Sequence, residues 1–571
     1  MRNSIQLGIA CLSLTVVACG RVGGSNDDRG PGVVGSSGAS GQGGIPGSET
    51  SGAGGRAAGA GAMAGFQPTP TDWEGRPIYS RMVRLTNSQW QHAVTDILRL
   101  SAPPNFAEGF EPPYPYISDF TNNERVLNVG ERQLQDYEAA AEAAAALATG
   151  SASALAALSD ETTAEGFVRV FGKRAFRRPL THDEEVKYQQ VFTQGETLYG
   201  AGFANGASLV IRAMLQSPEF LYRSELGPAG EPLNGYELAS KLSLLLLDTT
   251  PSDALLDIAA AGQLDSVDAL EATARQMLED PRARDALRTF HVELYHSDAS
   301  YPNYWSGVPE FTDALHAEFV EGSHRFFDDV FTENGGLREL LTSDRAYVGP
   351  NLAPFYGITP APSALEARLV GSSRIGYFMQ VPFLLLTHAS IDRTIIPREP
   401  NSIGRGVTLE GRVLCGLEYG LELSRLPALE PNQTNRQRIS ALTNADPSCA
   451  RCHQDRIDAL GFAFENFDGF GQERQTDNGF PIDTSGRYPF TEGVKEFADG
   501  KELMTILASS EQAHLCYAKM LASYGLQRDI IEADSAFIET LAKVSRSGST
   551  KELVISLIKA PAFRVREAGN P

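Results

Sequence analysis

The sequence predicts a mainly α-helical protein of several domains, and three features of the chain support this prediction. The chain has 571 residues, more than one hydrophobic core usually organises, so we expect three or more packed units. From about residue 76 onward, apolar residues recur with the spacing of helices, and the alternation typical of strands is scarce. The composition, 42% hydrophobic and 21% charged, is that of a chain able to bury large cores.

The capping residues of several helices indicate where these helices begin. Thr86 is followed by Gln89, and Thr181 by Glu184, which is the capping-box pattern at a helix start. Further helices are expected at 134–148, 233–247, 254–261, 267–278 and 281–294. Segments rich in Pro and Gly at 103–116 and 301–309 are expected to be connectors, and the least helical regions are expected at 400–447 and 469–490.

The first 18 residues have the pattern of an export signal. Arg2 supplies a positive charge, and residues 5–18 are largely apolar and of signal-peptide length. The segment ends in Val16-Val17-Ala18-Cys19, which resembles a lipobox, so residues 1–18 are predicted to be a lipoprotein signal peptide and Cys19 the lipidated residue. A simple secretory signal cleaved nearby, or a cysteine present there by chance, is the alternative.

Residues 19–75 are predicted to be a tether. Its composition is dominated by Gly, Ser and Ala, which offer nothing to bury and give a flexible chain. Gly20 carries no charge, so retention at an inner membrane by an Asp at this position is not indicated. We therefore expect an exported cell-envelope lipoprotein, at the outer membrane, held to the membrane by its N-terminal lipid.

The net charge limits the partners that the chain can have. Asp and Glu number 71 against 49 Lys and Arg, which gives a net charge of −22. A field of this sign repels phosphate backbones, so nucleic acid is not expected as a partner. After the N-terminus no apolar run approaches the roughly 20 residues that span a bilayer.

The chain's most specific chemical pattern is Cys449-Ala450-Arg451-Cys452-His453. In a Cys-x-x-Cys-His motif the two thiols form thioethers to haem and the adjacent His binds the iron. From this composition, such a match is expected by chance about once in a thousand chains of this length. Export fits independently, since haem c is attached after translocation. The motif therefore predicts covalent haem c at Cys449, Cys452 and His453.

Two other chemistries remain open for this motif. The two cysteines can close as a local disulfide, or can hold zinc together with two further ligands. Under the haem interpretation, a second axial ligand to the iron is also open. The candidates are Met504, Met520, Met379, His388 and His514. A methionine on a helix more often packs in a core than binds a metal.

The remaining cysteines are assigned by elimination. Of the six, Cys11 leaves with the signal peptide, Cys19 carries lipid, and two belong to the motif. Thiols without a partner are unusual in an oxidising compartment, so Cys415 and Cys516 are predicted to form a disulfide. The alternative is two buried thiols too far apart to bond.

Charged clusters on either side of these motifs have a functional and a structural interpretation. Asp458, Glu465 and Asp468 could lie near a haem propionate, bind a cation or transfer protons, or they could serve turns and helix ends with Arg474 as ion-pair partner. The arginines at 174, 177 and 178 could bind an anion, or could pair with the acidic surface. We favour the structural interpretation for both clusters.

The order of motifs resembles that of a known family. The segments that carry the resemblance are 84–98, 171–181, 215–222, 236–243, 352–357, 374–406, 449–453, 465–468 and 524–528. Together they are similar to planctomycete-type secreted proteins built from five successive domains of unknown function with a cytochrome-c-like motif. The resemblance implies helical domains at 76–150, 160–225, 226–360, 368–475 and 476–571, with the motif in the fourth and a cytochrome-c-like C-terminal portion.

The family's activity is not established, so the resemblance adds architecture and location more than a reaction. The chain departs from the family pattern in two places. Leu442-Thr443-Asn444 stands where the family often has a His, a few residues before the first motif cysteine. An insertion that reaches Arg405 disrupts the Ser-Pro that usually precedes Arg-Gly. We expect a mono-haem protein acting in electron transfer or as an oxidoreductase of unknown substrate, with an unknown redox partner. The alternative is a haem-free, envelope-anchored binding or scaffold lipoprotein for envelope polymers, with the motif cysteines as a disulfide.

Overall fold

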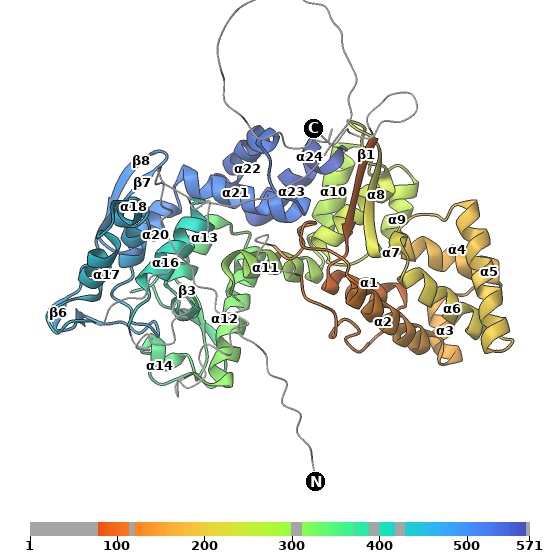
Figure 1. Ribbon diagram of the computed structural model, residues 1–571, viewed down its shortest axis with the longest axis horizontal. Coiled ribbons are helices and arrows are strands. Elements are labelled where there is room, and N and C mark those ends of the chain that lie inside the picture. Colours follow the sequence, from red (N-terminus) through yellow and green to blue (C-terminus); the bar gives the residue numbers. More distant parts are fainter. Residues whose placement is uncertain are drawn as a thin grey trace, which may run out of the picture.

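The structure is a computed structural model that describes residues 78–113, 120–297, 311–371, 373–386, 399–416 and 429–566. The predicted signal peptide, Cys19, the tether and His388 lie outside the described residues. The described residues are mainly helical, with four two-stranded sheets, which confirms the predicted fold class. Figure 1 shows the helices spread along the long axis, with the earliest helices at one end and the sequence motif's region at the other.

The first hydrophobic core is built by helices from the N-terminal part of the chain. These are α1 (Asn87–Ile97), α2 (Glu131–Thr149), α3 (Ala152–Leu158), α4 (Ala164–Ala175), α5 (His182–Tyr199), α6 (Phe203–Leu215) and α7 (Pro218–Leu221). Trp90 is fully buried among them, with ring centroids 5.0 Å from Phe110 and 6.0 Å from Tyr137. Thr86 and Thr181 both form the predicted capping boxes, which satisfy the first backbone N–H groups of α1 and α5.

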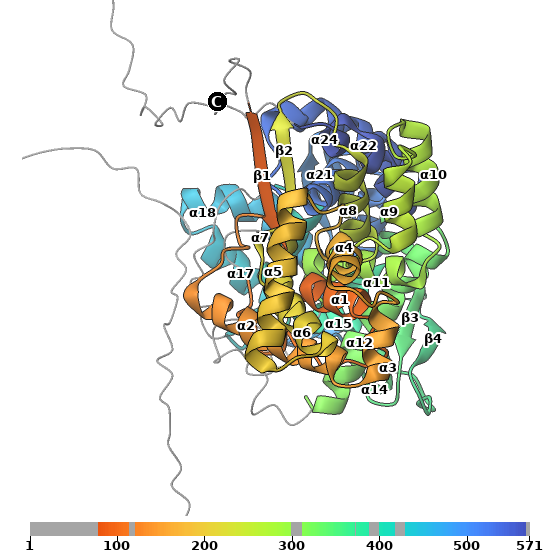
Figure 2. The same ribbon diagram turned by 90° about the vertical axis from the view of Figure 1, so that its right-hand side faces the viewer.

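A two-stranded antiparallel sheet joins the start of this region to its end. β1 (Ile78–Arg84) pairs with β2 (Tyr222–Pro228), so that Arg84 lies opposite Tyr222. Figure 2 shows the two strands running side by side along the molecule. Sequence periodicity did not predict these strands, because their partners are far apart in the chain and neither segment alternates strictly between apolar and polar residues.

The arginines that follow α4 are structural. Arg174 pairs with Asp253 at 3.0 Å and Arg178 with Glu184 at 2.8 Å. Arg177 is buried, and its guanidinium donates to the carbonyl oxygens of residues 219, 220 and 222. Burial lowers the pKa of Arg177 to about 10. The favoured interpretation of this cluster as a scaffold is confirmed.

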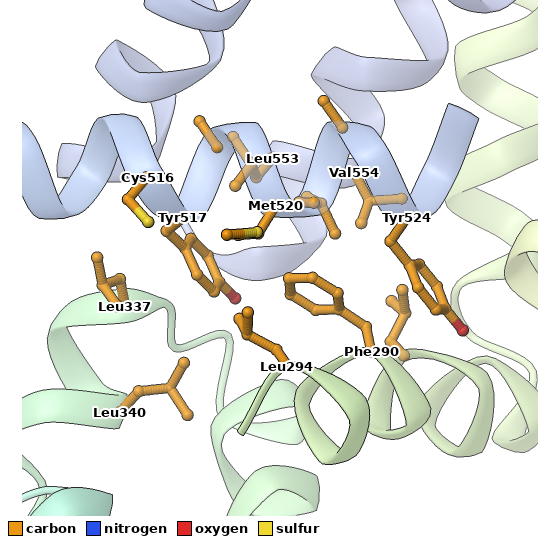
Figure 3. Packing of buried hydrophobic residues seen from close by; sticks show 14 of the residues in the cluster. Phe290, Leu294, Leu337, Leu340, Cys516, Tyr517, Met520, Tyr524, Leu553 and Val554 are labelled. Carbon is orange, nitrogen blue, oxygen red and sulfur yellow. The ribbon is translucent and has the colours of Figure 1, made fainter. Parts of the chain in front are cut away.

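The second core is larger and takes helices from the rest of the chain. Its N-terminal half contains α8 (Gly235–Leu246), α9 (Asp253–Ala260), α10 (Val267–Met277), α11 (Pro281–Tyr295), α12 (Asp313–Thr332), α13 (Leu337–Thr342) and α15 (Val381–Leu386). The C-terminal helices α20 (Gly500–Leu507), α21 (Glu511–Leu526), α22 (Ser535–Ser547), α23 (Thr550–Lys559) and α24 (Pro561–Arg564) complete it. In Figure 3, Tyr517 and Tyr524 of α21 point toward Phe290 of α11. The end of the chain thus forms part of the middle of the molecule.

Small elements surround the second core. They are β3 (Arg345–Val348), α14 (Ala353–Tyr356), β4 (Glu366–Leu369), η1 (Tyr377–Met379) and η4 (Glu532–Asp534). Within the described ranges, no single helix has both the length and the hydropathy needed to cross a membrane. α2 and α3 reach those values only as a pair, which is bent by 104°. Five alanines of α2, at positions 140, 141, 144, 145 and 148, are buried in the first core.

The region around the cysteine motif is more helical than expected. It contains α16 (Ser402–Thr408), η2 (Leu409–Val413), α17 (Asn435–Thr443), α18 (Pro447–Cys452), η3 (His453–Ile457) and α19 (Asp458–Phe462), followed by β5 (Thr476–Asp477), β6 (Phe480–Pro481), β7 (Gly486–Phe490) and β8 (Gly493–Phe497). The prediction that 400–447 is among the least helical regions was wrong for α16, η2 and α17. Gly404 and Gly406 resemble helix breakers in sequence but lie within α16.

Two glycines let α16 and α19 cross in backbone contact. A Cβ atom on Gly406 would lie 1.9 Å from the carbonyl oxygen of Ile457, and one on Gly461 would lie 1.9 Å from that of Ser402. Beneath the crossing, buried Arg405 donates to the carbonyl oxygens of Phe464 and Phe467. Only glycine fits at either position, because the nearest atoms are backbone and cannot turn away.

Gly406→Ala should therefore destabilise the protein by about 1 to 3 kcal/mol or more, since α16 must move off α19. Denaturant unfolding of the purified chain measures this loss. Gly109→Ala is the matched control, because a Cβ there meets nothing within 4 Å and should leave the midpoint unchanged. Equal midpoints for both variants would contradict the close crossing.

Candidate functional site

The two motif cysteines lie on an exposed helix. α18 begins at Pro447, its N-cap Asp446 accepts a hydrogen bond from the Ser448 N–H at 2.8 Å, and none of its residues is buried. Cys449 is half-buried and Cys452 is exposed, and both are present as thiols rather than as a disulfide. Because none of its residues is fully buried, α18 gains little from packing, and its conformation depends on its caps and on the segment that follows.

His453 is held by a buried carboxylate. Its Nδ1 lies 2.9 Å from Oδ1 of Asp458, and Oδ2 of Asp458 accepts a hydrogen bond from the Thr443 hydroxyl at 2.6 Å. Asp458 is only 1% exposed, whereas the His453 side chain is 12% exposed. A carboxylate at Nδ1 fixes the tautomer in which that nitrogen carries the proton, which leaves Nε2 as the acceptor.

A π-helical turn brings these two residues together. In an α-helix, residues five apart point in directions that differ by roughly 140°. η3 spans His453–Ile457 with wider turns, and the backbone N–H of Asp458 donates to the carbonyl oxygen of His453. Both the backbone and the side chain of Asp458 thus contact His453. This contact could not be predicted from the sequence, because α-helical spacing places residues 453 and 458 on different faces.

The geometry fits a covalently attached haem. Two thiols and a histidine ring lie on one exposed segment, and no residue that the structure describes hydrogen-bonds to Nε2 of His453. Among the described residues, no group of three or more His, Cys, Asp and Glu side chains is arranged to hold a metal ion. Were haem c bound at this segment, Cys449 and Cys452 would supply the two sulfurs for the porphyrin and His453 the imidazole nitrogen for its iron.

The residues predicted as a second axial ligand are engaged elsewhere where the structure describes them. His514 commits both ring nitrogens, Nδ1 to the Ser545 hydroxyl at 2.8 Å and Nε2 to the Ala508 carbonyl oxygen at 3.2 Å. Met379, Met504 and Met520 pack in the second core. The fifth candidate, His388, lies outside the described residues. The four described candidates thus have structural surroundings.

Two of the three carboxylates after the motif are structural, as the favoured interpretation expects. Glu465 pairs with Arg474 at 2.7 Å, and its burial raises the pKa of this carboxyl against the opposing effect of that guanidinium. Asp468 accepts from the backbone N–H groups of Phe470 and Gln472 and so closes a turn. Asp458 lies at the junction of η3 and α19 and hydrogen-bonds to His453 and Thr443, contacts that neither interpretation named.

A partly buried ion pair connects η3 to η2. Glu410 of η2 is fully buried and lies 2.6 Å from Arg456 of η3. Burial and the nearby carboxylate of Glu410 raise the pKa of Tyr488, which lies on β7. Because Arg456 is three residues after His453, this pair holds the motif's segment against α16 and η2.

The disulfide then connects η2 to the C-terminal helices. Cys415 follows η2 directly and is joined to Cys516 of α21, with Cα atoms 5.4 Å apart. Cys516 is buried in the second core. A covalent and ionic path therefore runs from α21 through Cys415 and Glu410 to the turn that carries His453.

Asp458→Ala should destabilise the protein by about 1 to 3 kcal/mol, because the His453 ring loses its carboxylate partner and the Thr443 hydroxyl keeps only the Ile439 carbonyl oxygen. Asp458→Asn keeps one acceptor and should cost less. The control is Asp455→Ala, which removes an exposed ion pair with Arg487 worth about 0 to 1 kcal/mol. Urea unfolding of the three variants measures these changes in stability. An unfolding midpoint of Asp458→Ala equal to that of Asp455→Ala would exclude the proposed role of Asp458.

Comparison with known proteins gives five matches in series along the chain. Residues 84–150 match a protein of unknown function (DUF1587), 163–225 match DUF1595, 233–358 match DUF1592, 383–477 match DUF1588 and 494–563 match DUF1585. No curated protein and no solved structure matches the chain. The chain therefore carries five successive domains of unknown function in the planctomycete-type multi-domain arrangement. The cysteine motif lies within the DUF1588 segment.

The five matched segments do not form five separate cores. Those at 84–150 and 163–225 contribute almost all of the first core, and the last three share the second. The matched units are therefore sequence modules that share hydrophobic cores with one another. The motif's segment is packed into the larger of the two cores through Leu460 and Phe464.

Proposed function

We propose that the protein is an exported lipoprotein carrying a single c-type haem at Cys449, Cys452 and His453, and that it acts in electron transfer or as an oxidoreductase. The observation that carries the proposal is the contact of His453 with Asp458, backed by Thr443. A carboxylate behind a histidine is the usual support of a metal-binding imidazole.

Each residue has a stated task in this proposal. Cys449 and Cys452 supply the two sulfurs that bond to the porphyrin, and the open face of α18 gives room for it. Asp458 holds the proton on Nδ1 of His453, so that Nε2 is presented to iron. When bound, haem supplies a one-electron centre whose potential depends on its axial ligands and surroundings. Arg456 and Glu410 fix the turn that carries His453.

The direct test is production of the full chain in a host with a c-haem maturation system. Haem staining after denaturation should show one covalent haem, and the reduced protein should give a c-type absorption spectrum. Asp458→Asn should raise the reduction potential of the bound haem. A neutral amide accepts the Nδ1–H hydrogen bond of His453 more weakly than a carboxylate does, which makes the imidazole a weaker donor to the iron. A response of the reduced spectrum to carbon monoxide would indicate an open iron position and hence catalysis.

The same preparation tests the alternative function. Unreduced peptides in which Cys449 is joined to Cys452, together with protein that retains no haem on denaturation, would support the haem-free binding or scaffold lipoprotein. For the anchor, a labelled fatty acid should be incorporated into the wild-type chain and not into Cys19→Ser. The membrane, through this lipid, and an unknown redox partner or envelope polymer are the partners in this proposal.

A further inference from the structure

A histidine and a tyrosine form a hydrogen-bonded pair inside the second core. His291 of α11 and Tyr517 of α21 are both almost fully buried, and Nε2 of His291 lies 2.8 Å from the Tyr517 hydroxyl. The two rings are stacked, with their centroids 6.0 Å apart. Figure 3 shows the Tyr517 ring directed from α21 toward α11. Neither residue belongs to the proposed haem site, so the pair is a separate feature of the molecule.

The direction of this hydrogen bond follows from the other contacts of the two side chains. Burial lowers the pKa of His291 to about 3, against the opposing effect of a hydrogen bond from its ring to the Leu287 carbonyl oxygen. The ring is therefore neutral at ordinary pH, and because a carbonyl oxygen only accepts, Nε2 is the nitrogen without a proton. The Tyr517 oxygen also lies 3.0 Å from the Thr550 hydroxyl. With Thr550 donating to it, Tyr517 donates its own proton to His291.

A second buried tyrosine on the same helix lacks such a base. Tyr524 and Tyr517 both contact the ring of Phe290, with centroids 5.4 Å and 5.7 Å away (Figure 3). The Tyr524 hydroxyl, however, donates to the backbone carbonyl oxygen of Ala286 at 3.3 Å. An imidazole nitrogen takes up a proton readily, whereas a backbone carbonyl oxygen does not. Of these two phenols, Tyr517 is the one that has a proton acceptor in place.

Aromatic rings continue from this pair through the second core. The His291 ring lies 5.3 Å from that of Phe327, which in turn lies 4.8 Å from that of Tyr377. Tyr377 lies 6.1 Å from Phe383 of α15, at the start of the matched segment that contains the cysteine motif. Closely spaced π systems leave only short gaps for an electron to cross. The pair is thus connected to α15 by a continuous series of rings.

We propose that Tyr517 and His291 are a redox-active pair, in which Tyr517 gives up one electron while its hydroxyl proton moves to Nε2 of His291. A phenol that loses an electron becomes a strong acid, so its oxidation is easiest where a base accepts the proton. The O–H bond of Tyr517 breaks, an N–H bond forms on His291, and a neutral tyrosyl radical and an imidazolium remain. The oxidant, a high-valent transition-metal centre, is reduced by one electron. Because burial disfavours the imidazolium, the proton goes back to Tyr517 when an electron returns.

The test is photochemical oxidation of the full chain, made without a haem maturation system so that no haem signal overlaps that of the radical. A flash of light on tris(bipyridine)ruthenium with persulfate generates ruthenium(III), which removes one electron from tyrosine. Freeze-quenched wild-type protein should give a tyrosyl EPR signal coupled to an exchangeable proton, the new N–H of His291. Tyr517→Phe should lose the coupled signal. His291→Phe should slow its formation by about a hundredfold, because the proton acceptor is gone.

Tyr524→Phe is the matched control, since it removes a buried hydroxyl from the same helix. It should keep the coupled signal at the wild-type level. All three substitutions retain an aromatic ring, and near-UV circular dichroism checks that the core stays packed. The proposal is overturned if wild-type protein gives no coupled signal, if Tyr517→Phe retains it, if Tyr524→Phe loses it, or if His291→Phe forms it at the wild-type rate. None of these outcomes bears on haem attachment, because the protein tested carries no haem.

Discussion

Replacing Cys449 and Cys452 together by Ser should abolish covalent haem and leave the fold intact. Both thiols lie on α18, where Cys449 is half-buried and Cys452 is exposed, so replacing sulfur by oxygen removes little packing. Surface changes of this kind usually alter the free energy of unfolding by less than about 0.5 kcal/mol. Haem staining of denatured protein and the absorption spectrum measure the first effect, and thermal unfolding of the haem-free proteins measures the second.

Arg451→Ala is the control for this prediction, because Arg451 is exposed and lies between the two cysteines without a role in attachment. It should retain haem at the wild-type level. His453→Ala separates attachment from iron binding: some thioether-linked haem should remain, with an altered spectrum. A wild-type amount of covalent haem in the double serine variant would contradict the assignment.

The second large effect is expected from the disulfide. Cys415 and Cys516 are separated by 101 residues, and closing a loop of this size stabilises the folded state by about 4 to 5 kcal/mol in the chain-entropy model. Cys415→Ser, Cys516→Ser or the double variant should therefore lose a similar free energy of unfolding. The loss should appear in denaturant curves of the second core, because that core contains Cys516 and the helices on both sides of it.

A reductant provides the internal comparison. It should lower the unfolding midpoint of the wild-type chain and have no effect on the double serine variant. Mass spectrometry of unreduced peptides should show Cys415 joined to Cys516. If the reductant leaves the wild-type midpoint unchanged while that peptide link is present, the loop closure contributes less than the model predicts.

Features that depend on neighbouring residues were predictable from the sequence. The capping boxes at Thr86 and Thr181 mark helix starts because the cap and its partner are three residues apart. The helices at 235–246, 267–277 and 281–295 follow from apolar periodicity within each segment. The cysteine motif was recognisable for the same reason, since all of its groups lie within five residues.

Features that depend on distant or irregular contacts were not predictable. β1 and β2 pair across more than 130 residues, and nothing within either strand indicates the other. Asp458 reaches His453 only because η3 departs from α-helical spacing. The close crossing of α16 and α19 uses Gly406 and Gly461, which in sequence resemble interruptions. In each case the partner is chosen by tertiary packing rather than by local pattern.

The contribution of the last helices to the second core has a consequence for the order of folding during synthesis. The first core needs almost nothing beyond Leu221, whereas the second remains open until α21 to α24 have been made. Domains close from the N-terminus as the chain emerges. In the proposed export of the chain, Cys415, Cys449 and Cys452 would therefore all precede Cys516 into the compartment where thiols can react. Attachment of a porphyrin to Cys449 and Cys452 in that interval would leave Cys516 as the partner with which Cys415 forms a disulfide.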